Sequence, residues 1–401
     1  MSMIPNVLKS RVLQDIASGL TARIVAGIAA IIAVPVLVHT LGPERYAAIG
    51  LFLTVQMLGG LLDIGFSTGL GRQAAWLTGI NAGREKFATL LRSFEIPYLA
   101  IAAAITILGT IFGQAFLIAV FKFDPQTLGL DHLGVILIFA AVGIRFPFNL
   151  YINYLSGRGK IQRANLILLA TELLRIIGAV ILVVWFGPYL SIFFGWQVFV
   201  ATTAVAILYV ASWRITPTDT ARIVPEWRNL HEIRGLMWGA SNMIVLFIAA
   251  NAIDKLLLPR FIGAAEYGLY VATGQLALSV FLIVQAVWAA LNPRLLASIA
   301  AKDAKATRGV FLIATGLMTA LFCGFMIATM IATPSVLRIW IGSAASHYDA
   351  SASRFDIVLV ALCAGFGMAG LSYLALTIHQ AASRYFPTPL IFSAAIIGVP
   401  L

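Results

Sequence analysis

Long apolar segments alternate with short polar connections along almost the whole chain. Ten segments have the length that a helix needs to cross a membrane, and an eleventh begins near residue 386. A helix needs about 20 apolar residues to span the hydrocarbon core of a bilayer. The predicted spans are 20–41, 46–69, 94–119, 133–155, 163–186, 189–212, 236–259, 267–291, 309–333 and 355–379. The pattern therefore predicts an all-α polytopic membrane protein with about 11 transmembrane segments.

The composition agrees with this prediction. Of the 401 residues, 61% are hydrophobic and only 11% are charged, and the mean hydropathy is +0.96. A soluble globule of this size would need far more polar surface. The composition therefore indicates a protein that is embedded in a bilayer.

The basic residues are distributed unevenly between the two ends of the predicted spans. The formal net charge is +11, with 18 Lys and Arg on the side that holds the N-terminus and six on the opposite side. Positive loops stay on the cytoplasmic side of a membrane. We therefore expect a multi-pass membrane protein with a cytoplasmic N-terminus. The excess charge is explained by topology, so we expect no nucleic-acid partner.

The first 19 residues precede the first predicted span. An apolar residue recurs every four positions from Ile4 to Ile16, which is typical of a short helix lying at the membrane interface. Charged residues interrupt this stretch, so it lacks the apolar core of a cleavable signal peptide. We expect an interfacial helix at 1–19.

A short motif occurs twice. Residues 41–46 read LGPERY and residues 262–267 read IGAAEY, an offset of 221. The same offset maps the seventh and eighth predicted spans onto the first two. We therefore expect two six-helix repeats around a central cavity, with a pseudo-twofold axis along the membrane normal.

The offset also predicts the domain organisation. The N-lobe covers 20–212, a cytoplasmic linker covers 213–235, and the C-lobe covers 236–401. A complete second repeat would end near 433, which is 212 plus 221. We therefore expect a C-lobe of about five helices, cut short relative to the first.

Residues suited to catalysis or metal binding are sparse. The five His are scattered without ligand spacing, and both Cys lie inside predicted spans. We therefore expect no cofactor, no metal site, no catalytic residues and no enzymatic activity.

The fourth predicted span carries a charge near the middle of the membrane. Arg145 lies about 13 residues into it, and Asn149 and Asn153 follow at i+4 and i+8. A charge at this depth costs roughly 2.5–3.5 kcal/mol on insertion scales, so it needs a reason. We expect a polar stripe that binds substrate, on a helix that Pro147 can kink. The alternative is an Arg held by backbone carbonyls in a helix contact.

The fifth span holds Glu172 and Arg175 near mid-depth. Their spacing of three lets them pair on one helix face. The pair is either an internal salt bridge that makes insertion tolerable or a site for an anion at Arg175 and a proton at Glu172.

The remaining candidates lie nearer the ends of spans. Asp254 and Lys255 are adjacent near the outer end of the seventh span, so one of them should point into the bundle. Arg23 and Asp63 lie near cytoplasmic ends, where they can also be ordinary boundary charges. We take Arg23 and Lys255 as further substrate-binding candidates, and Asp63 and Asp254, with Glu172, as candidates for ion or proton coupling. Cations match or outnumber acids in the interior, which favours an anionic solute.

Several short motifs resemble those of one known family. Residues 41–46 resemble the LGPEEYG turn of polysaccharide flippases, and residues 62–65 with Arg72 resemble their LDLG…R series. Residues 252–256, 263–270 and 292–294 resemble the DK…EYGLY…PR series of the second half. Their order and spacing are similar to the Wzx-type O-antigen and exopolysaccharide flippases, in the same superfamily as MATE multidrug exporters.

This resemblance implies a lipid-linked oligosaccharide flippase of surface polysaccharide and lipopolysaccharide biosynthesis, located in a bacterial inner membrane and working by alternating access. Its substrate is a polyprenyl-diphosphate-linked oligosaccharide, and its surroundings are the lipid bilayer and other polysaccharide-assembly proteins. The motifs include Asp63, Asp254 and Lys255, whereas Arg145, Glu172 and Arg175 are candidates by depth and charge alone. Two alternatives stay open: a cation-coupled multidrug exporter of the same superfamily, and a membrane glycan polymerase or ligase.

Overall fold

A computed structural model describes residues 6–63, 65–80, 82–216, 225–226 and 252–275, with scattered positions between 308 and 340. These residues include the first six predicted spans and parts of the seventh, eighth and ninth. The tenth and eleventh predicted spans, and most of the linker, lie outside the described residues. Throughout the described ranges the structure is built from helices and turns, and they contain no strand.

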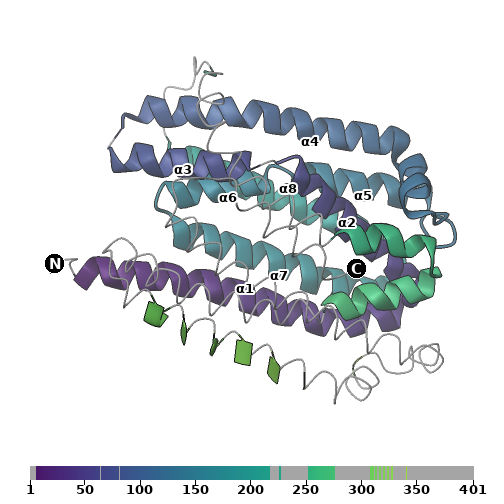
Figure 1. The fold of residues 1–401 in the computed structure, drawn as a ribbon. Helices are drawn as coiled ribbons and strands as arrows, with labels where there is room; N and C mark the ends of the chain where they lie inside the picture. Colours follow the sequence, from purple (N-terminus) through teal and green to yellow (C-terminus); the bar gives the residue numbers. More distant parts are fainter. Residues whose placement is uncertain are drawn as a thin grey trace.

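The first half of the chain folds into a bundle of long helices that lie side by side (Figure 1). The helices are α1 (Asn6–Leu41), α2 (Pro43–Leu61), α3 (Phe66–Gly79), α4 (Arg84–Phe121), α5 (His132–Arg145), α6 (Phe148–Gly157), α7 (Ile161–Phe186) and α8 (Leu190–Arg214). In the second half, residues 252–257 and 264–275 are helical, and the 3₁₀ helix η2 (Leu258–Arg260) follows the first of them.

The predicted spans of the first half are confirmed. Within the described residues, five helical segments are long and apolar enough to cross a membrane, or six if the bent pair α2 and α3 counts as one. The fourth predicted span appears as α5 and α6, and the second as α2 and α3. Helix α1 runs without interruption from the N-terminal segment into the first span, because no helix-breaking residue separates the two. The interfacial position of residues 1–19 stays a prediction.

Glycines bring neighbouring helices of the bundle into close contact. A Cβ on Gly157 of α6 would lie 2.2 Å from the backbone oxygen of Gly71 in α3, and a Cβ on Gly109 of α4 would lie 2.3 Å from the Cβ of Phe139 in α5. Small residues permit such approaches between membrane helices, where packing rather than water exclusion holds the helices together. Two of the major helix contacts of the bundle therefore depend on the absence of a side chain.

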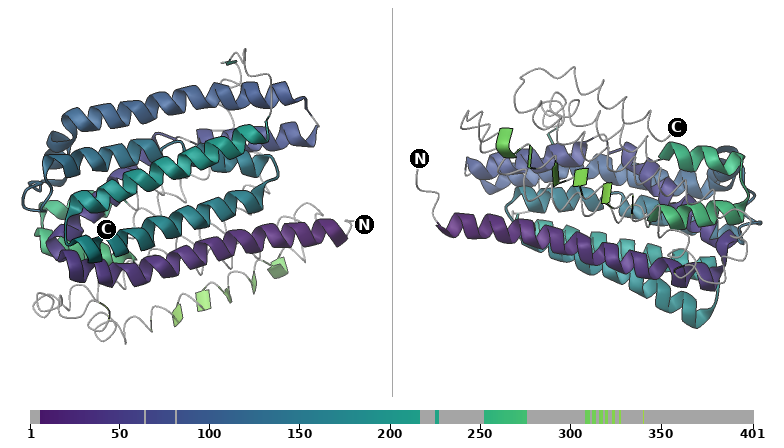
Figure 2. Two further views of the ribbon diagram at one scale, coloured as in Figure 1. Left: turned by 180° about the vertical axis from the view of Figure 1, so that it is seen from behind. Right: turned by 60° about the horizontal axis from the view of Figure 1, so that its bottom comes forward.

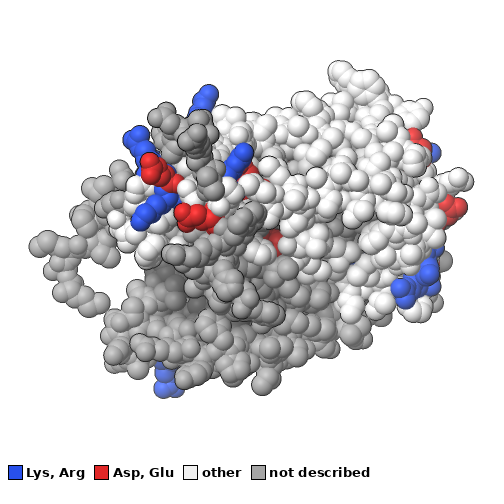
Figure 3. Space-filling view, turned by 90° about the horizontal axis from the view of Figure 1, so that it is seen from above, with Lys and Arg blue, Asp and Glu red and all other residues white. Residues whose placement is uncertain are grey.

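The charged residues gather at the two ends of the molecule. Figure 3 shows Lys, Arg, Asp and Glu at both ends and a broad uncharged zone between them. Exposed aromatic residues lie near one end of this zone, where Trp185 and Phe261 are 81% and 80% exposed. Aromatic side chains of this kind favour the membrane interface. The distribution fits a bilayer-spanning orientation of the bundle.

The duplicated motif forms the same backbone hydrogen bond in both copies. The backbone N–H of Tyr46 donates to the oxygen of Gly42 at 3.0 Å, and the N–H of Tyr267 donates to the oxygen of Gly263 at 2.9 Å. Both tyrosines are buried. The two copies therefore share this hydrogen bond and a buried tyrosine, but their backbones differ at the glycine, because Gly42 has a φ of +82° and Gly263 is not among the described glycines with a positive φ.

The two copies also pack against each other. A Cβ on Gly50 of α2 would lie 2.5 Å from a Val271 methyl, and a Cβ on Gly268 would lie 2.0 Å from the Pro43 oxygen and 3.1 Å from the Ala47 nitrogen. The offset of 221 relates Gly50 to Val271, and Ala47 to Gly268. We call this contact, formed by Pro43, Ala47, Gly50, Gly268 and Val271, the repeat seam.

The seam fixes the direction of the pseudo-symmetry axis. Two residues one helical turn apart each meet their own repeat equivalent, as in a self-complementary twofold contact. In an antiparallel pair of helices, only one residue could lie opposite its own repeat equivalent. Two successive pairs do so here, so α2 and the helix 264–275 run parallel, and the pseudo-twofold axis lies between them. The green helices of residues 252–275 lie beside the end of the molecule where α1 meets α2 (Figures 1 and 2).

The glycine contact between α3 and α6 gives a stability prediction. Gly157→Ala should lower the free energy of unfolding by roughly 1–3 kcal/mol, because the new methyl group meets backbone that cannot rotate away. Gly195→Ala in α8 is the control, since nothing described lies within 4 Å of its added methyl group. It should be neutral or stabilising by about 0.5–1 kcal/mol. Thermal unfolding of the detergent-purified variants measures both, and equal midpoints would contradict the prediction.

Candidate functional site: charges at two helix breaks

The fourth membrane span is broken at its centre. Helix α5 ends at Arg145 and α6 begins at Phe148, with Pro147 between them. Proline has no N–H to donate to Gly143, and the Gly143 oxygen instead accepts from the N–H of Phe146 at 3.1 Å. The predicted kink is confirmed, and it leaves Arg145 at the end of a helix inside the membrane.

Arg145 meets the charged pair of α7. Its Nη2 donates to Glu172 Oε1, and Arg175 donates to Glu172 Oε2 through Nε at 2.8 Å. The three side chains are only 14–22% exposed. The structure thus joins three residues that the sequence placed at similar depth on two separate spans.

This charged cluster of Arg145, Glu172 and Arg175 carries one more positive than negative charge. In addition, Nη1 of Arg145 is buried, and no described group accepts a hydrogen bond from it. The guanidinium lies over the ring of Phe148, with its carbon 4.6 Å from the ring centroid. Burying a cation whose N–H donor has no acceptor costs free energy, unless a further acceptor forms the missing hydrogen bond. The cluster therefore has the chemistry of an anion-binding site.

The second span is also broken, and an acid lies at the break. Helices α2 and α3 meet at an angle of 53°, and Gly65 adopts a positive φ of 73° before α3. Asp63 accepts from the N–H of Ser67 at 2.9 Å and from its hydroxyl at 2.6 Å. These bonds satisfy the free N-terminus of α3, in the manner of a helix cap.

Tyr98 of α4 connects the two breaks. Its hydroxyl donates to Asp63, and its ring stacks on Phe146 with the centroids 5.0 Å apart. Phe146 follows Arg145 directly. Asp63 and the charged cluster are therefore linked through one aromatic residue, a relation that no spacing in the sequence indicates.

The side chains of Asp254 and Lys255 lie together, although residues that are adjacent in a helix are expected to point in different directions. The sequence placed them on different faces, but Lys255 Nζ lies 2.9 Å and 3.2 Å from the two carboxylate oxygens of Asp254. Tyr270 also donates to this carboxylate. The long lysine side chain bends back along its own helix. Asp254 is thus held by a tyrosine, as Asp63 is.

The other polar candidates lie apart from the cluster. Asn153 donates from its side chain to the backbone oxygen of Asn149 at 3.0 Å, within α6. Pro147 interrupts the helix between Arg145 and these two residues, so the polar stripe stays a prediction. Asn149 is exposed, as is Arg23 of α1. Their roles in binding remain predictions.

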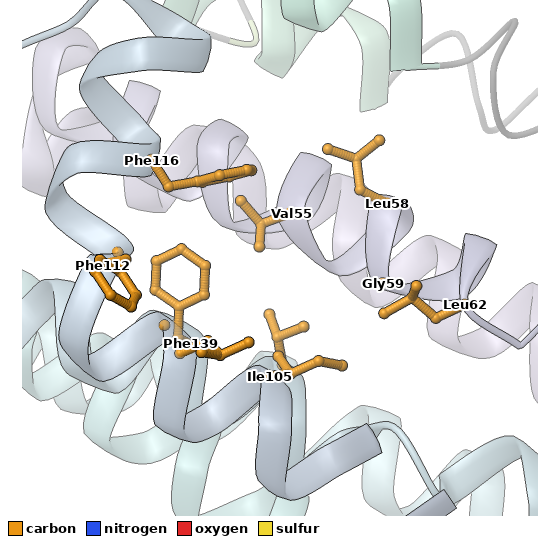
Figure 4. A pocket seen from close by; sticks show the side chains of 12 residues that line it. Val55, Leu58, Gly59, Leu62, Ile105, Phe112, Phe116 and Phe139 are labelled. Carbon is orange, nitrogen blue, oxygen red and sulfur yellow. The ribbon is translucent and has the colours of Figure 1, made fainter. Parts of the chain in front are cut away.

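The described cavity next to this region is apolar. It has a volume of about 320 Å³ and lies between α2, α4 and α5 (Figure 4). Val142, one turn before Arg145, belongs to its wall. Its lining consists of Val55, Leu58, Gly59, Leu62, Ile105, Leu108, Gly109, Phe112, Gly113, Phe116, Phe139 and Val142. With no polar side chain in the wall, this space cannot hold a charged headgroup.

Sequence reasoning missed one buried acid, Glu95 of α4. It is fully buried and accepts from Arg92 at 2.7 Å, from the Tyr151 hydroxyl at 2.7 Å and from the Trp213 indole at 3.2 Å. These donors come from α4, α6 and α8, so Glu95 braces three helices. An acid three residues after an arginine was a visible signal, but it fell at the edge of the predicted span 94–119.

The role of Glu95 in holding three helices together gives a stability prediction. Glu95→Ala should cost about 1–3 kcal/mol, because the hydroxyl of Tyr151 and the indole of Trp213 lose their common buried acceptor, whereas Arg92 is 43% exposed and stays hydrated. Glu95→Gln keeps an acceptor oxygen and should cost less. Folded yield and thermal unfolding measure the effect. Equal stability of the Ala variant and the parent would contradict the bracing role.

The described helices define a polytopic membrane protein, and comparison with known proteins specifies its fold. No protein-family model and no curated protein matches the sequence. Among solved structures, the chain is similar to the inward-facing conformation of a multidrug resistance MATE family transporter of the MOP superfamily. The TM-score is 0.72 and the identity 17%, over 93% of this chain and 91% of that one.

Two further structures share the fold. The outward-facing conformation of a multidrug resistance MATE family transporter gives a TM-score of 0.54 at 16% identity, over 98% of this chain and 91% of that one. A MOP superfamily transporter from Pyrococcus furiosus, for which a reversed polarity of the binding pocket suggests a different function, gives 0.55 at 16% identity, over 97% and 89%. The chain has the fold of MATE transporters, and these identities establish the fold alone.

Proposed function

We propose that this protein is a transporter that moves a polyprenyl-diphosphate-linked oligosaccharide across a bacterial inner membrane by alternating access. The observation that carries the proposal is the charged cluster of Arg145, Glu172 and Arg175, which has a net positive charge and an unused buried donor on Arg145. The fold supports membrane transport in general, and the cluster supports an anionic solute in particular.

The chemistry of the cluster suits a diphosphate. An Arg guanidinium can hold two phosphate oxygens at once, and a diphosphate offers several acceptors to two such groups. Glu172 keeps the two cations together until a stronger anionic partner arrives. Arg23, Asn149, Asn153 and Lys255 would add contacts to the phosphate or the sugars as the headgroup passes.

Removal of the guanidinium groups tests this role. Arg145→Ala and Arg175→Ala should each lower affinity for a fluorescent polyprenyl-diphosphate oligosaccharide by roughly tenfold to a hundredfold, the value of a charged hydrogen bond. The measurement is flipping of the probe in proteoliposomes. Arg163→Ala is the matched control, because Arg163 is an exposed arginine on the same helix α7. Normal flipping by both cluster variants, at normal folded yield, would refute the proposal.

A second candidate is a cation-coupled multidrug exporter. The observation that favours it is the fold, since solved structures with this arrangement include multidrug transporters. A cationic drug would be repelled by the charged cluster, so the sign of the binding site distinguishes the two functions. Efflux of a cationic dye by the parent, unchanged in Arg145→Ala, together with no flipping of the diphosphate probe, would favour the exporter.

Energy coupling can be tested at Glu172. In Glu172→Gln the two arginines lose their competing carboxylate, so the anionic probe should bind more tightly and be released more slowly. If Glu172 exchanges an ion or proton during the cycle, the parent should slow when a protonophore collapses the gradient, whereas the variant should be slow with or without it. If the variant flips the probe at the parent's rate and is slowed by the protonophore like the parent, Glu172 is not the coupling residue. The candidates for coupling are then Asp63 and Asp254, each of which accepts a hydrogen bond from a tyrosine hydroxyl.

A further inference from the structure

We infer that the repeat seam is the closed outer gate of the transport cycle, and that Gly50 and Gly268 are the residues that allow it to close. This inference concerns how the two halves move. It goes beyond the choice of solute, and it holds for a glycan lipid or for a drug.

The first observation is the position of the seam. It lies where α1 turns into α2, at the end of the molecule opposite the N-terminus (Figure 1). The distribution of basic residues predicts a cytoplasmic N-terminus, so the seam belongs to the outer side. A contact between the halves at this end closes the path from any central cavity to the outside.

The second observation is the chemistry of the contact. All five seam residues are apolar, and the flanking Tyr46 and Tyr267 are buried. Packing alone holds such a surface together, so it can part without breaking ion pairs. Any side chain at position 268 would begin 2.0 Å from the Pro43 oxygen, far inside the contact distance. Closure at this distance therefore requires glycine.

The third observation is a hydrogen bond between the halves, made by Trp340, which packs against the same hydrophobic cluster as the seam residues Ala47 and Val271. Pro35 in α1 has no N–H, so it cannot donate to the Ile31 oxygen as a normal helical residue would. The indole N–H of Trp340 donates to this oxygen at 3.2 Å instead. Parting of the halves must break this bond. The described contacts between the halves therefore include both packing and one replaceable hydrogen bond.

Solved structures of this fold include an inward-facing and an outward-facing conformation. An inward-facing transporter is closed on its outer side, as the seam is here. In an outward-facing state, the seam residues would have to separate.

The first experiment uses a buried thiol as a reporter. Thr54 is fully buried one turn beyond Gly50, and its hydroxyl donates to the Gly50 oxygen at 2.8 Å. Thr54→Cys is introduced into a chain whose Cys323 and Cys363 are replaced by Ser. Whole cells are then treated with a membrane-impermeant maleimide. In this background the thiol should be labelled slowly, only while the seam is open.

Gly268→Leu in the reporter chain should raise the labelling rate several-fold, because the seam cannot close. Gly195→Leu adds the same bulk to α8, where nothing described lies within 4 Å, and should leave the rate unchanged. Trp340→Phe, which keeps the ring but loses the donor, should give an intermediate increase. An unchanged rate in Gly268→Leu at normal folded yield, or labelling only from the cytoplasmic side, would overturn the inference. No substrate is needed, so this result is independent of the proposed function.

A second experiment guards against misfolding of the bulky variant. Gly50→Cys with Val271→Cys removes the valine methyl groups and joins positions whose Cβ atoms would lie 3.2 Å apart. A mild oxidant should link them, which shows that the seam closes in the membrane. The reduced thiols should react with the impermeant maleimide from outside, which shows that it opens. Failure to cross-link, or cross-linking without any labelling, would each overturn the inference.

Discussion

A membrane helix cannot break without finding partners for the backbone groups that the break releases, because the hydrocarbon core offers no water to replace them. This constraint accounts for much of the polar structure described here. Ser67 and Asp63 complete the start of α3, and the N–H of Phe146 takes the place of the one that Pro147 lacks. The indole of Trp340 does the same for the carbonyl opposite Pro35. Each irregularity is thus tied to a specific polar partner.

The charged cluster follows from the same constraint, and it marks how far sequence reasoning could reach. Depth along the predicted spans identified Arg145, Glu172 and Arg175 as interior charges, and the structure brings all three together. Their meeting across α5 and α7 depends on tertiary packing, which spacing within one helix cannot reveal. The predicted stripe of Asn149 and Asn153 lies beyond the interruption at Pro147, on the short helix α6. Glu95 was overlooked because hydropathy locates the apolar centre of a span better than its ends.

The repeat was the most informative sequence signal, because a fixed offset predicts geometry as well as similarity. It predicted a pseudo-twofold axis, and the seam shows residues meeting their own equivalents across it. The first six spans were likewise predictable from apolar length. Which glycines would form the seam was not predictable, since the chain has 34 of them and several of the described ones pack against residues of the same half. Only the assembled fold distinguishes Gly50 and Gly268 from the rest.

The charged cluster is a contact within the first half, whereas the repeat seam is a contact between the two halves, and this difference constrains the transport mechanism. Arg145, Glu172 and Arg175 all lie within the first half, on α5 and α7, whereas the seam joins the two halves. If the halves move as units, the cluster stays intact in every state and only its access to the two sides changes. A bound anion must then compete with Glu172 in the inward- and outward-facing states alike. Differences in affinity between those states, which directional transport requires, must come from groups that the second half brings near the cluster.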